Sequence, residues 1–460
     1  MAASKRDPST ARGRGGENRR FARSAGGLSV GIGLAGLTTY LYFSLAAHNL
    51  TPEDYGEVVV LWSAVFVLIS VLHRPVEQLL SRSIADREAR DAPTRDAIVA
   101  AARIELVVAV GWIAAALALK RPLADDLLDG NETLYWILVV AVLAFAASFF
   151  ARGYMAGRRR FGAVAAIIIC ESLGRAAFAL VVALGIAAGQ TVVALGIVAA
   201  PFISLVVVPI ALSRGDAEAN EERAPEPAPG SRGGSGTGFA AAVLCVMAAE
   251  QTLLNAGPLL VSAFEGPALA GFVFNVLMVA RAPLVVFQGV STSILPHLTR
   301  LHARGGAESL AEFDRSVRTV LLAIGGFTVA VICGLLLAGP AVMQLAFSDE
   351  FIYGRGELCL IAAGMGLYLS STTLSQAALA GGLARAAAGC WLAAALTFLL
   401  WCVFGPLDPA LRVETGFLGA ALALFASLTS LYPRARSGAG GLDERDEATA
   451  RLRLSEDAGL

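Results

Sequence analysis

The chain has 460 residues, of which 56% are hydrophobic and only 16% are charged, and its mean hydropathy is +0.66. Soluble domains carry about 25% charged residues, so this composition requires lipid around most of the chain and leaves no globular soluble domain. The formal net charge is −1, and this balance gives no reason to expect nucleic acid as a partner.

Twelve apolar stretches along the chain are close to the roughly 20 residues that a membrane-spanning helix needs. These predicted spans lie near 24–47, 56–79, 98–119, 134–155, 161–185, 191–212, 239–262, 268–295, 317–338, 357–380, 386–404 and 414–432. The fold class predicted is therefore an all-α membrane protein of about 12 transmembrane helices.

A polar segment, Ser213–Gly238, separates the sixth span from the seventh. It contains Pro225, Pro227 and Pro229 followed by a Gly/Ser run, a composition that predicts a disordered linker. The predicted organisation is a basic cytoplasmic tail (1–23), an N-terminal six-helix bundle (24–212), the cytoplasmic linker (213–238), a C-terminal six-helix bundle (239–432) and a disordered cytoplasmic tail (433–460).

The positions of lysine and arginine test this topology, because cytoplasmic connections retain positive charge. If the N-terminus lies inside, 29 of the 36 Lys and Arg residues fall in inward segments and four in outward segments. The remaining three, Arg74, Arg175 and Arg281, lie within spans. The sequence thus predicts a multi-pass protein of a bacterial cytoplasmic membrane with both termini in the cytoplasm.

The two halves also show weak internal similarity. Tyr55-Gly56 aligns with Ala270-Gly271 at a shift of 215 residues, and the same shift places Arg103 over Arg318. Two six-helix halves share one orientation, which predicts a parallel repeat of the kind found in many secondary transporters.

Five ionisable residues inside the spans are candidates for a functional site, since charge at this depth is costly. Glu171 and Arg175 are four residues apart, which places them on one helix face. They form either a structural ion pair or part of a cavity lining. Glu250 and Arg281 have no local partner of opposite sign, and we predict that they face a wet cavity or each other. Arg74 lies near the inward end of the second span, where anchoring at the interface is the alternative to a cavity role.

Charged residues close to the ends of spans have a simpler expected role. Glu105, just inside the third span, is predicted to be interfacial. Arg158-Arg159-Arg160 forms a very short inward loop that topology alone explains, although arginine there also suits a phosphate group arriving from the cytoplasmic leaflet.

Motifs typical of enzymes do not occur in the sequence. It contains no GxxxxGK[ST], HExxH or GxSxG pattern, and its six cysteines lie in apolar stretches without CxxC spacing. We therefore expect no catalytic residue, no metal site and no cofactor, and we do not expect an enzyme.

The sequence resembles the polysaccharide-export flippases, in a superfamily with the multidrug and toxin extrusion (MATE) transporters and the lipid II flippases. The likeness rests on Arg152–Phe161 followed by Glu171 and Arg175, on Ala280–Pro296, and on the turn Thr51–Gly56. It extends as a diffuse pattern from about residue 24 to residue 432.

The resemblance implies a MATE-like fold of two six-helix bundles around a central cavity that opens alternately to each side. It implies a polyprenyl-linked glycan as cargo, with Arg281, Arg175 and Arg74 as contacts of the anionic head group. Glu171 and Glu250 offset part of this positive charge. The other implied partners are membrane lipids and envelope polysaccharide assembly proteins, and the energy source is a coupling ion or the membrane potential.

Three other functions remain open from the sequence. One is cation-coupled multidrug export of the MATE type. Many such exporters resemble one another in carrying an acidic residue in the first helix, and Ser24–Ala47 contains none. Glu250 could serve instead. A polytopic membrane glycosyltransferase is suggested by Glu53-Asp54 in the first outward loop, but the outward loops are short. The chain would also suit a scaffold for envelope assembly that has lost transport.

Overall fold

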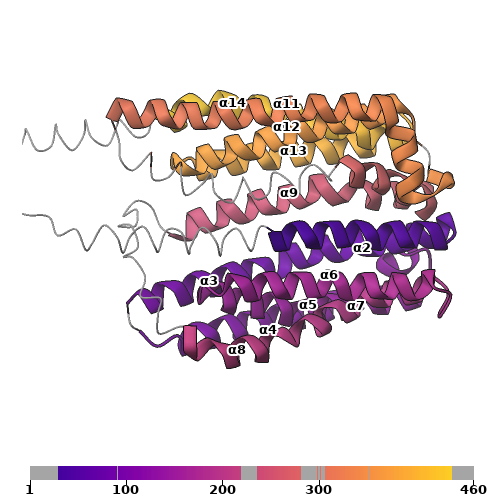
Figure 1. Ribbon diagram of the computed structural model, residues 1–460, viewed down its shortest axis with the longest axis horizontal. Helices are drawn as coiled ribbons and strands as arrows, with labels where there is room; N and C mark the ends of the chain where they lie inside the picture. Colours follow the sequence, from indigo (N-terminus) through magenta and orange to yellow (C-terminus); the bar gives the residue numbers. More distant parts are fainter. Residues whose placement is uncertain are drawn as a thin grey trace, which may run out of the picture. The chain divides into compact units, whose positions relative to one another are not determined.

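The computed structural model describes residues 30–90, 92–218, 236–280, 298, 301, 306–351 and 353–437 (Figure 1). Over these residues the secondary structure is helical and contains no strand, which confirms the predicted all-α fold class. The helices are Val30–Asn49, α2 (Pro52–Leu72), α3 (Arg74–Ala89), α4 (Arg95–Ala118), α5 (Glu132–Gly157), α6 (Phe161–Ala183), α7 (Gln190–Leu205), α8 (Val207–Glu218), α9 (Gly236–Glu265), Pro267–Ala280, α11 (Gly306–Phe347), α12 (Arg355–Ala380), α13 (Ala384–Phe404) and α14 (Pro409–Ser437). Two short helices, η1 (Pro122–Leu127) and η2 (Asp349–Phe351), lie in connections.

Eleven helical segments of the described chain are long and apolar enough to cross a membrane. They correspond to eleven of the twelve predicted spans. The predicted eighth span, 268–295, is described only as the shorter apolar helix Pro267–Ala280. Large apolar side chains cover the outer faces, as on α11, where Leu337 and Leu345 are 81% and 83% exposed. Such faces require lipid rather than water, so the chain is a multi-pass membrane protein.

The packing of the described Cα atoms divides the chain into two compact units. Unit 1 comprises Met1–Phe43, Leu72–Leu119 and Trp136–Ala228, and unit 2 comprises Ser44–Val71, Lys120–Tyr135 and Pro229–Leu460. The predicted linker also has helical ends, because α8 continues to Glu218 and α9 begins at Gly236. Residues 219–235 and both predicted tails beyond 30–437 lie outside the described residues.

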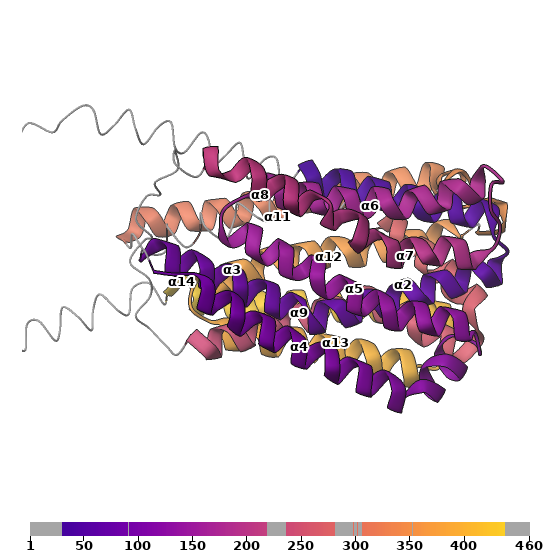
Figure 2. The same ribbon diagram turned by 90° about the horizontal axis from the view of Figure 1, so that it is seen from below.

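In unit 1, α3 lies beside α4 and α6 packs along α7 (Figures 1 and 2). Gly153 and Gly157 allow α5 to approach α3 closely. A Cβ atom on Gly153 would lie 2.8 Å from the carbonyl oxygen of Glu77, and one on Gly157 would lie 2.8 Å from Cβ of Ile84. This close approach is what brings the polar face of α3 against α5.

The second predicted span is broken into α2 and α3 at His73. Pro75 explains the break, because its ring nitrogen has no hydrogen to donate to the carbonyl of Val71 and its ring clashes with that carbonyl. The Glu77 amide instead starts α3 by donating to the His73 carbonyl oxygen at 3.0 Å. The chain passes from unit 2 to unit 1 between Val71 and Leu72, next to this break.

In unit 2, α12 packs against both α11 and α14, and α13 lies against α9 and α14. The N-terminal part of α11 extends to the end of α14. There, Asp314 accepts a hydrogen bond from Tyr432 at 2.8 Å and forms an ion pair with Arg436 at 3.1 Å. At the other end, the Tyr55 hydroxyl donates to Asn275 of the helix Pro267–Ala280.

The glycine contact between α5 and α3 leads to a prediction about stability. Replacing Gly157 by Leu forces the new side chain into Ser81 and Ile84, and we expect a loss of about 1–3 kcal/mol, the usual cost of overpacking. Thermal unfolding of the purified protein in detergent micelles measures this loss. Gly111→Leu on α4 is the matched control, because a Cβ there meets nothing within 4 Å. Equal unfolding temperatures for the two variants would contradict the close packing of α5 on α3.

Candidate functional site

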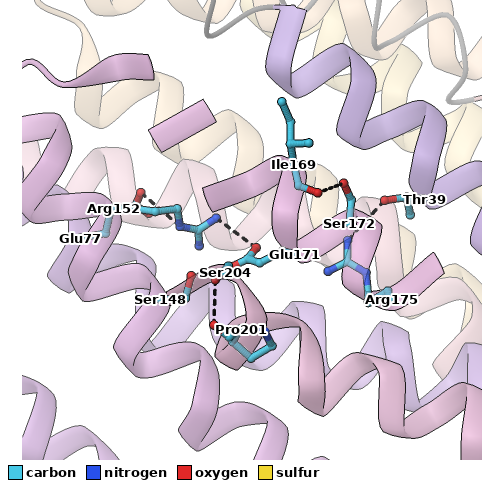
Figure 3. Close-up of polar contacts among 10 residues, drawn as sticks. All are labelled: Thr39, Glu77, Ser148, Arg152, Ile169, Glu171, Ser172, Arg175, Pro201 and Ser204. Carbon is cyan, nitrogen blue, oxygen red and sulfur yellow. Dashed lines mark hydrogen bonds and ion pairs between the residues drawn. The ribbon is translucent and has the colours of Figure 1, made fainter. Parts of the chain in front are cut away.

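Arg152 is the centre of a charged cluster in unit 1. Its Nε atom lies 3.9 Å from Oε1 of Glu77 on α3, and its Nη1 atom lies 3.8 Å from Oε2 of Glu171 on α6. The guanidinium also stacks over the Phe149 ring at 3.8 Å. Figure 3 shows Arg152 between the two carboxylates. Glu77, Arg152 and Glu171 come from three different helices, and each residue lies within a predicted membrane span.

Local helix geometry explains how the cluster assembles. Ser148 and Arg152 are four residues apart on α5 and therefore share one face. Ser148 donates a hydrogen bond to Glu171, while Arg152 on the next turn pairs with the same carboxylate. Glu77 reaches Arg152 because Gly153 leaves no side chain between α5 and the α3 backbone.

The electrostatic contacts of Arg152 are ion pairs and not hydrogen bonds. N–H···O hydrogen bonds have donor–acceptor distances of about 2.7–3.2 Å, shorter than the two contacts here. The Nε atom of Arg152 is buried and has no hydrogen-bond partner among the described residues. The side chain is only 11% exposed. The site thus contains a largely buried cation whose Nε donor another acceptor group could use.

The predicted pair Glu171 and Arg175 lies on α6, one turn apart and buried at both positions. Arg175 donates from Nη2 to the hydroxyl of Thr39 at 3.3 Å, as Figure 3 shows. Glu171 meets Arg152 as described above. Both residues therefore belong to the same interior region of unit 1, and the choice between a structural and a cavity role stays a prediction.

Arg152 and Glu77 are charged residues of this cluster that the sequence interpretation did not single out. Only Arg74, Arg175 and Arg281 are placed within spans from the sequence, so Arg152 is counted with the inward charges, whereas the structure places it within α5, five residues before the last residue of the helix. The available signal was its spacing from Ser148 and its position after Phe149, which together mark one polar and aromatic helix face.

Arg74 and the three loop arginines have different surroundings. Arg74 is half-buried at the start of α3, within electrostatic range of Glu77. Arg158 pairs with Glu88 at 3.4 Å, and Arg160 donates to the Ala211 carbonyl oxygen at 3.0 Å. Arg159 is exposed, with a φ of 58°. Two of the three loop arginines thus brace neighbouring helices of unit 1, and the predicted entrance role remains a prediction for this loop.

Unit 2 contains carboxylates that are paired with phenols. Glu250 on α9 accepts a hydrogen bond of 2.7 Å from Tyr368 on α12. Glu414 on α14, which the sequence interpretation did not single out, is 2% exposed and accepts a hydrogen bond from Tyr353. Burial, and then the Glu414 charge, raises the pKa of the Tyr353 hydroxyl far above its usual value, so this hydroxyl is a donor at neutral pH. Arg281, the predicted partner of Glu250, lies outside the described residues.

Glu105 and His73 form another buried contact in unit 1. His73 Nδ1 lies 2.5 Å from Oε1 of Glu105, and the two side chains are 0% and 11% exposed. The predicted interfacial position of Glu105 stays a prediction, and the structure adds that α3 packs on α4 and buries this side chain against the helix break. Within the described residues no group of three His, Cys, Asp or Glu side chains could hold a metal ion.

The Arg152 cluster predicts a stability pattern that depends on charge balance. Arg152→Gln leaves the Glu77 and Glu171 carboxylates buried without their cation, and we expect a loss of about 3–5 kcal/mol. The triple variant Glu77→Gln, Arg152→Gln, Glu171→Gln removes all three charges together and should recover most of this loss.

Thermal unfolding in detergent micelles checks the pattern, with Arg159→Gln as the control. Because Arg159 is exposed, its variant should stay within about 0.5 kcal/mol of the parent. A triple variant less stable than Arg152→Gln would show that the three charges do not form one balanced cluster.

Comparison with known proteins adds to this geometry. No protein-family model and no curated protein matches the sequence. Solved structures do match. One is an inward-facing multidrug resistance MATE family transporter of the MOP superfamily, with 12% identity and a TM-score of 0.63 over 91% of this chain and 98% of that chain.

Two further MATE structures match over a similar length. The eukaryotic MATE transporter AtDTX14 has 13% identity and a TM-score of 0.60, and the match covers 92% of this chain and 98% of that chain. A MATE crystal structure in the straight conformation has 13% identity and a TM-score of 0.61, covering 92% and 96%. Likeness at such low identity establishes the architecture, and the chain has the fold of the MATE transporters.

Proposed function

We propose that this protein is a transporter that moves a lipid-linked oligosaccharide from the cytoplasmic to the outer leaflet by alternating access, for export of an envelope polysaccharide. The observation that best supports this proposal is Arg152, a buried cation within a membrane-spanning helix. Its carboxylate partners lie beyond hydrogen-bonding distance, and its Nε donor is unused among the described residues.

A phosphate oxygen suits this donor. The guanidinium group is planar, stays charged at all physiological pH values and binds phosphate in a fork geometry. The head group of a polyprenyl-linked glycan offers a diphosphate, while its apolar tail remains in the bilayer. In the proposed cycle Arg152 loosens its contact with Glu77 or Glu171 and binds this phosphate when cargo enters.

The other predicted ligands belong to the same proposal. Arg175 and Arg74 lie in unit 1 with Arg152, and they would supply further positive charge near the head group. Arg281 is proposed on the sequence alone. A coupling ion or the membrane potential would drive the cycle, and the proposed location is a bacterial cytoplasmic membrane with both termini inside. Membrane lipids and envelope polysaccharide assembly proteins are the proposed partners.

A second candidate is cation-coupled multidrug efflux. It is favoured by Glu250, a carboxylate within a membrane-spanning helix that contacts the Tyr368 hydroxyl, and by the multidrug resistance transporter among the structural neighbours. Many exporters of this type resemble one another in carrying an acidic residue in the first helix. The helix Val30–Asn49, however, contains no Asp or Glu. We therefore place this function second.

Reconstituted vesicles separate the two functions. The probe is a fluorescent polyprenyl-diphosphate oligosaccharide, and its transfer between leaflets is followed by quenching from outside. We expect the parent protein to accelerate transfer over empty vesicles. The triple variant Glu77→Gln, Arg152→Gln, Glu171→Gln keeps the fold but lacks the cation. Its transfer rate should be at least about tenfold lower than that of the parent, equivalent to about 1.4 kcal/mol.

Two controls make this result decisive. Arg159→Gln should transport at the parental rate, and Arg152→Lys should recover only part of the loss because lysine lacks the planar fork. Parental vesicles that leave the glycolipid in place but expel a fluorescent organic cation under a pH gradient would favour the efflux candidate and reject the flippase.

A further inference from the structure

Two helices of the described chain present most of their apolar surface to lipid. Among the eleven spans found in the described residues, α11 and α4 have the smallest buried shares, 11% and 22% of their most apolar stretches. The third predicted span of the N-terminal half is α4, and the third of the C-terminal half is α11. The two halves therefore turn the helix at the same place in their order toward the bilayer.

Arg103 is an exposed residue in the lipid-facing stripe of α4. Val99 lies one turn before it, and Leu106 and Val107 lie one turn after it. These three apolar side chains are 40%, 64% and 71% exposed. Residues three or four apart share one helix face, so Arg103 has lipid-facing side chains on both sides. The positive-inside rule accounts for arginine in a connecting segment, but it does not require one within such a stripe.

The described residues supply no counter-charge to Arg103. Its side chain takes part in none of the ion pairs or hydrogen bonds of the described chain. Glu105 is two residues away, about 200° around the helix, and lies against His73. Asp96 is almost two turns away and pairs with Arg87 at 3.3 Å. The acidic neighbours of Arg103 on its own helix are thus engaged elsewhere.

The depth of Arg103 brings its guanidinium within reach of lipid head groups. A hydrocarbon layer of about 30 Å corresponds to about 20 residues of an upright helix. Counted back from Ala118, the last residue of α4, such a stretch ends near Val99, and the Arg103 backbone lies about 6 Å inside it. Side chains of a helix tilt toward its N-terminus, and arginine extends its charged end to the interface. Both effects direct this guanidinium toward the phosphates of the nearer leaflet.

Arg318 on α11 repeats this arrangement in the C-terminal half. The shift of 215 residues that relates the halves places it over Arg103. Arg318 is exposed and takes part in no ion pair or hydrogen bond of the described chain, and Leu322 one turn later is 65% exposed. No charged residue follows it in α11. Asp314, one turn earlier, is already held by Tyr432 and Arg436.

We propose that Arg103 and Arg318 each bind the phosphate of an anionic phospholipid, in the leaflet that meets the N-terminal ends of α4 and α11. Guanidinium binds phosphate in a planar fork, and the exposed apolar side chains beside each arginine accommodate the acyl chains. The lipid is anionic because a zwitterionic lipid carries its own ammonium group beside the phosphate. On the predicted topology this is the cytoplasmic leaflet. The proposal goes beyond the transport function and does not depend on any cargo.

Native mass spectrometry of the full-length protein in detergent tests the proposal by counting bound lipids. The probe is phosphatidylglycerol, with phosphatidylcholine as the zwitterionic comparison. We expect the parent to retain at least two phosphatidylglycerol molecules that phosphatidylcholine does not replace. Arg103→Gln and Arg318→Gln should each retain one fewer, and the double variant two fewer, because loss of one arginine weakens binding of its lipid by at least about fivefold. Parental retention by the double variant would overturn the proposal.

Arg95→Gln is the matched control, because it removes the same charge from an exposed position of the same helix. Arg95 is the first residue of α4, about 12 Å further toward water, and its variant should retain the parental number of lipids. An equal loss in Arg95→Gln would show that total charge binds the lipid, and it would overturn a site at Arg103.

Thermal unfolding in detergent is an independent measurement on the same variants. Without lipid all of them should unfold at the parental temperature, since the replaced side chains are exposed. Added phosphatidylglycerol should raise the unfolding temperature of the parent, because a ligand stabilises the state that binds it. It should raise that of the double variant clearly less. An equal rise in both proteins would count against the two arginines.

Two competitors identify the occupant of the sites. A large excess of inorganic phosphate should leave phosphatidylglycerol bound, and its release would indicate a site for free anions instead of lipid. Polyprenyl phosphate should not replace phosphatidylglycerol at Arg103. If it does so in the parent but not in Arg103→Gln, this arginine captures cargo and the phospholipid proposal fails. Failure of glycolipid transfer in vesicles would reject the proposed transport function and leave these lipid sites standing.

Discussion

The ion pairs of Arg152 with Glu77 and Glu171 join α3 to the consecutive helices α5 and α6 inside an apolar bundle. Each of these charges alone would be expensive in such surroundings, and together they are tolerated. Several other features of unit 1 serve this arrangement. Gly153 admits the α3 backbone, Ser148 holds the Glu171 carboxylate, and Phe149 covers the guanidinium on its apolar side.

The two units use different partners for the carboxylates in their apolar interiors. Unit 1 sets Glu77 and Glu171 against a guanidinium and Glu105 against an imidazole. In unit 2, Glu250 and Glu414 accept hydrogen bonds from tyrosine hydroxyls. A phenol remains neutral, whereas arginine is always charged and histidine changes charge near neutral pH. The two units therefore differ in the chemistry that keeps their carboxylates in an apolar interior.

Most of the fold could be predicted from the sequence, because span length and hydropathy are local properties. The break at Pro75 is also local, since proline removes a specific helix hydrogen bond. The site was predicted only in part. Glu171, Arg175 and Glu250 stand out as charges in apolar runs, whereas Arg152 lies close enough to a basic loop to be counted with it. The partner of a buried charge depends on which helices pack together. His73 meets Glu105 because α3 packs against α4, and neither helix sequence indicates this tertiary contact.

The length of α11 has a mechanical meaning. A helix of 42 residues is about 63 Å long at 1.5 Å per residue, about twice the roughly 30 Å thickness of the hydrocarbon layer. The helix is therefore longer than the hydrocarbon layer is thick, and its Asp314 is fastened to Tyr432 and Arg436 near the end of α14. Because Asp314 fastens the polar end of α11 to the end of α14, a tilt of α11 within the lipid would carry the end of α14 sideways with it.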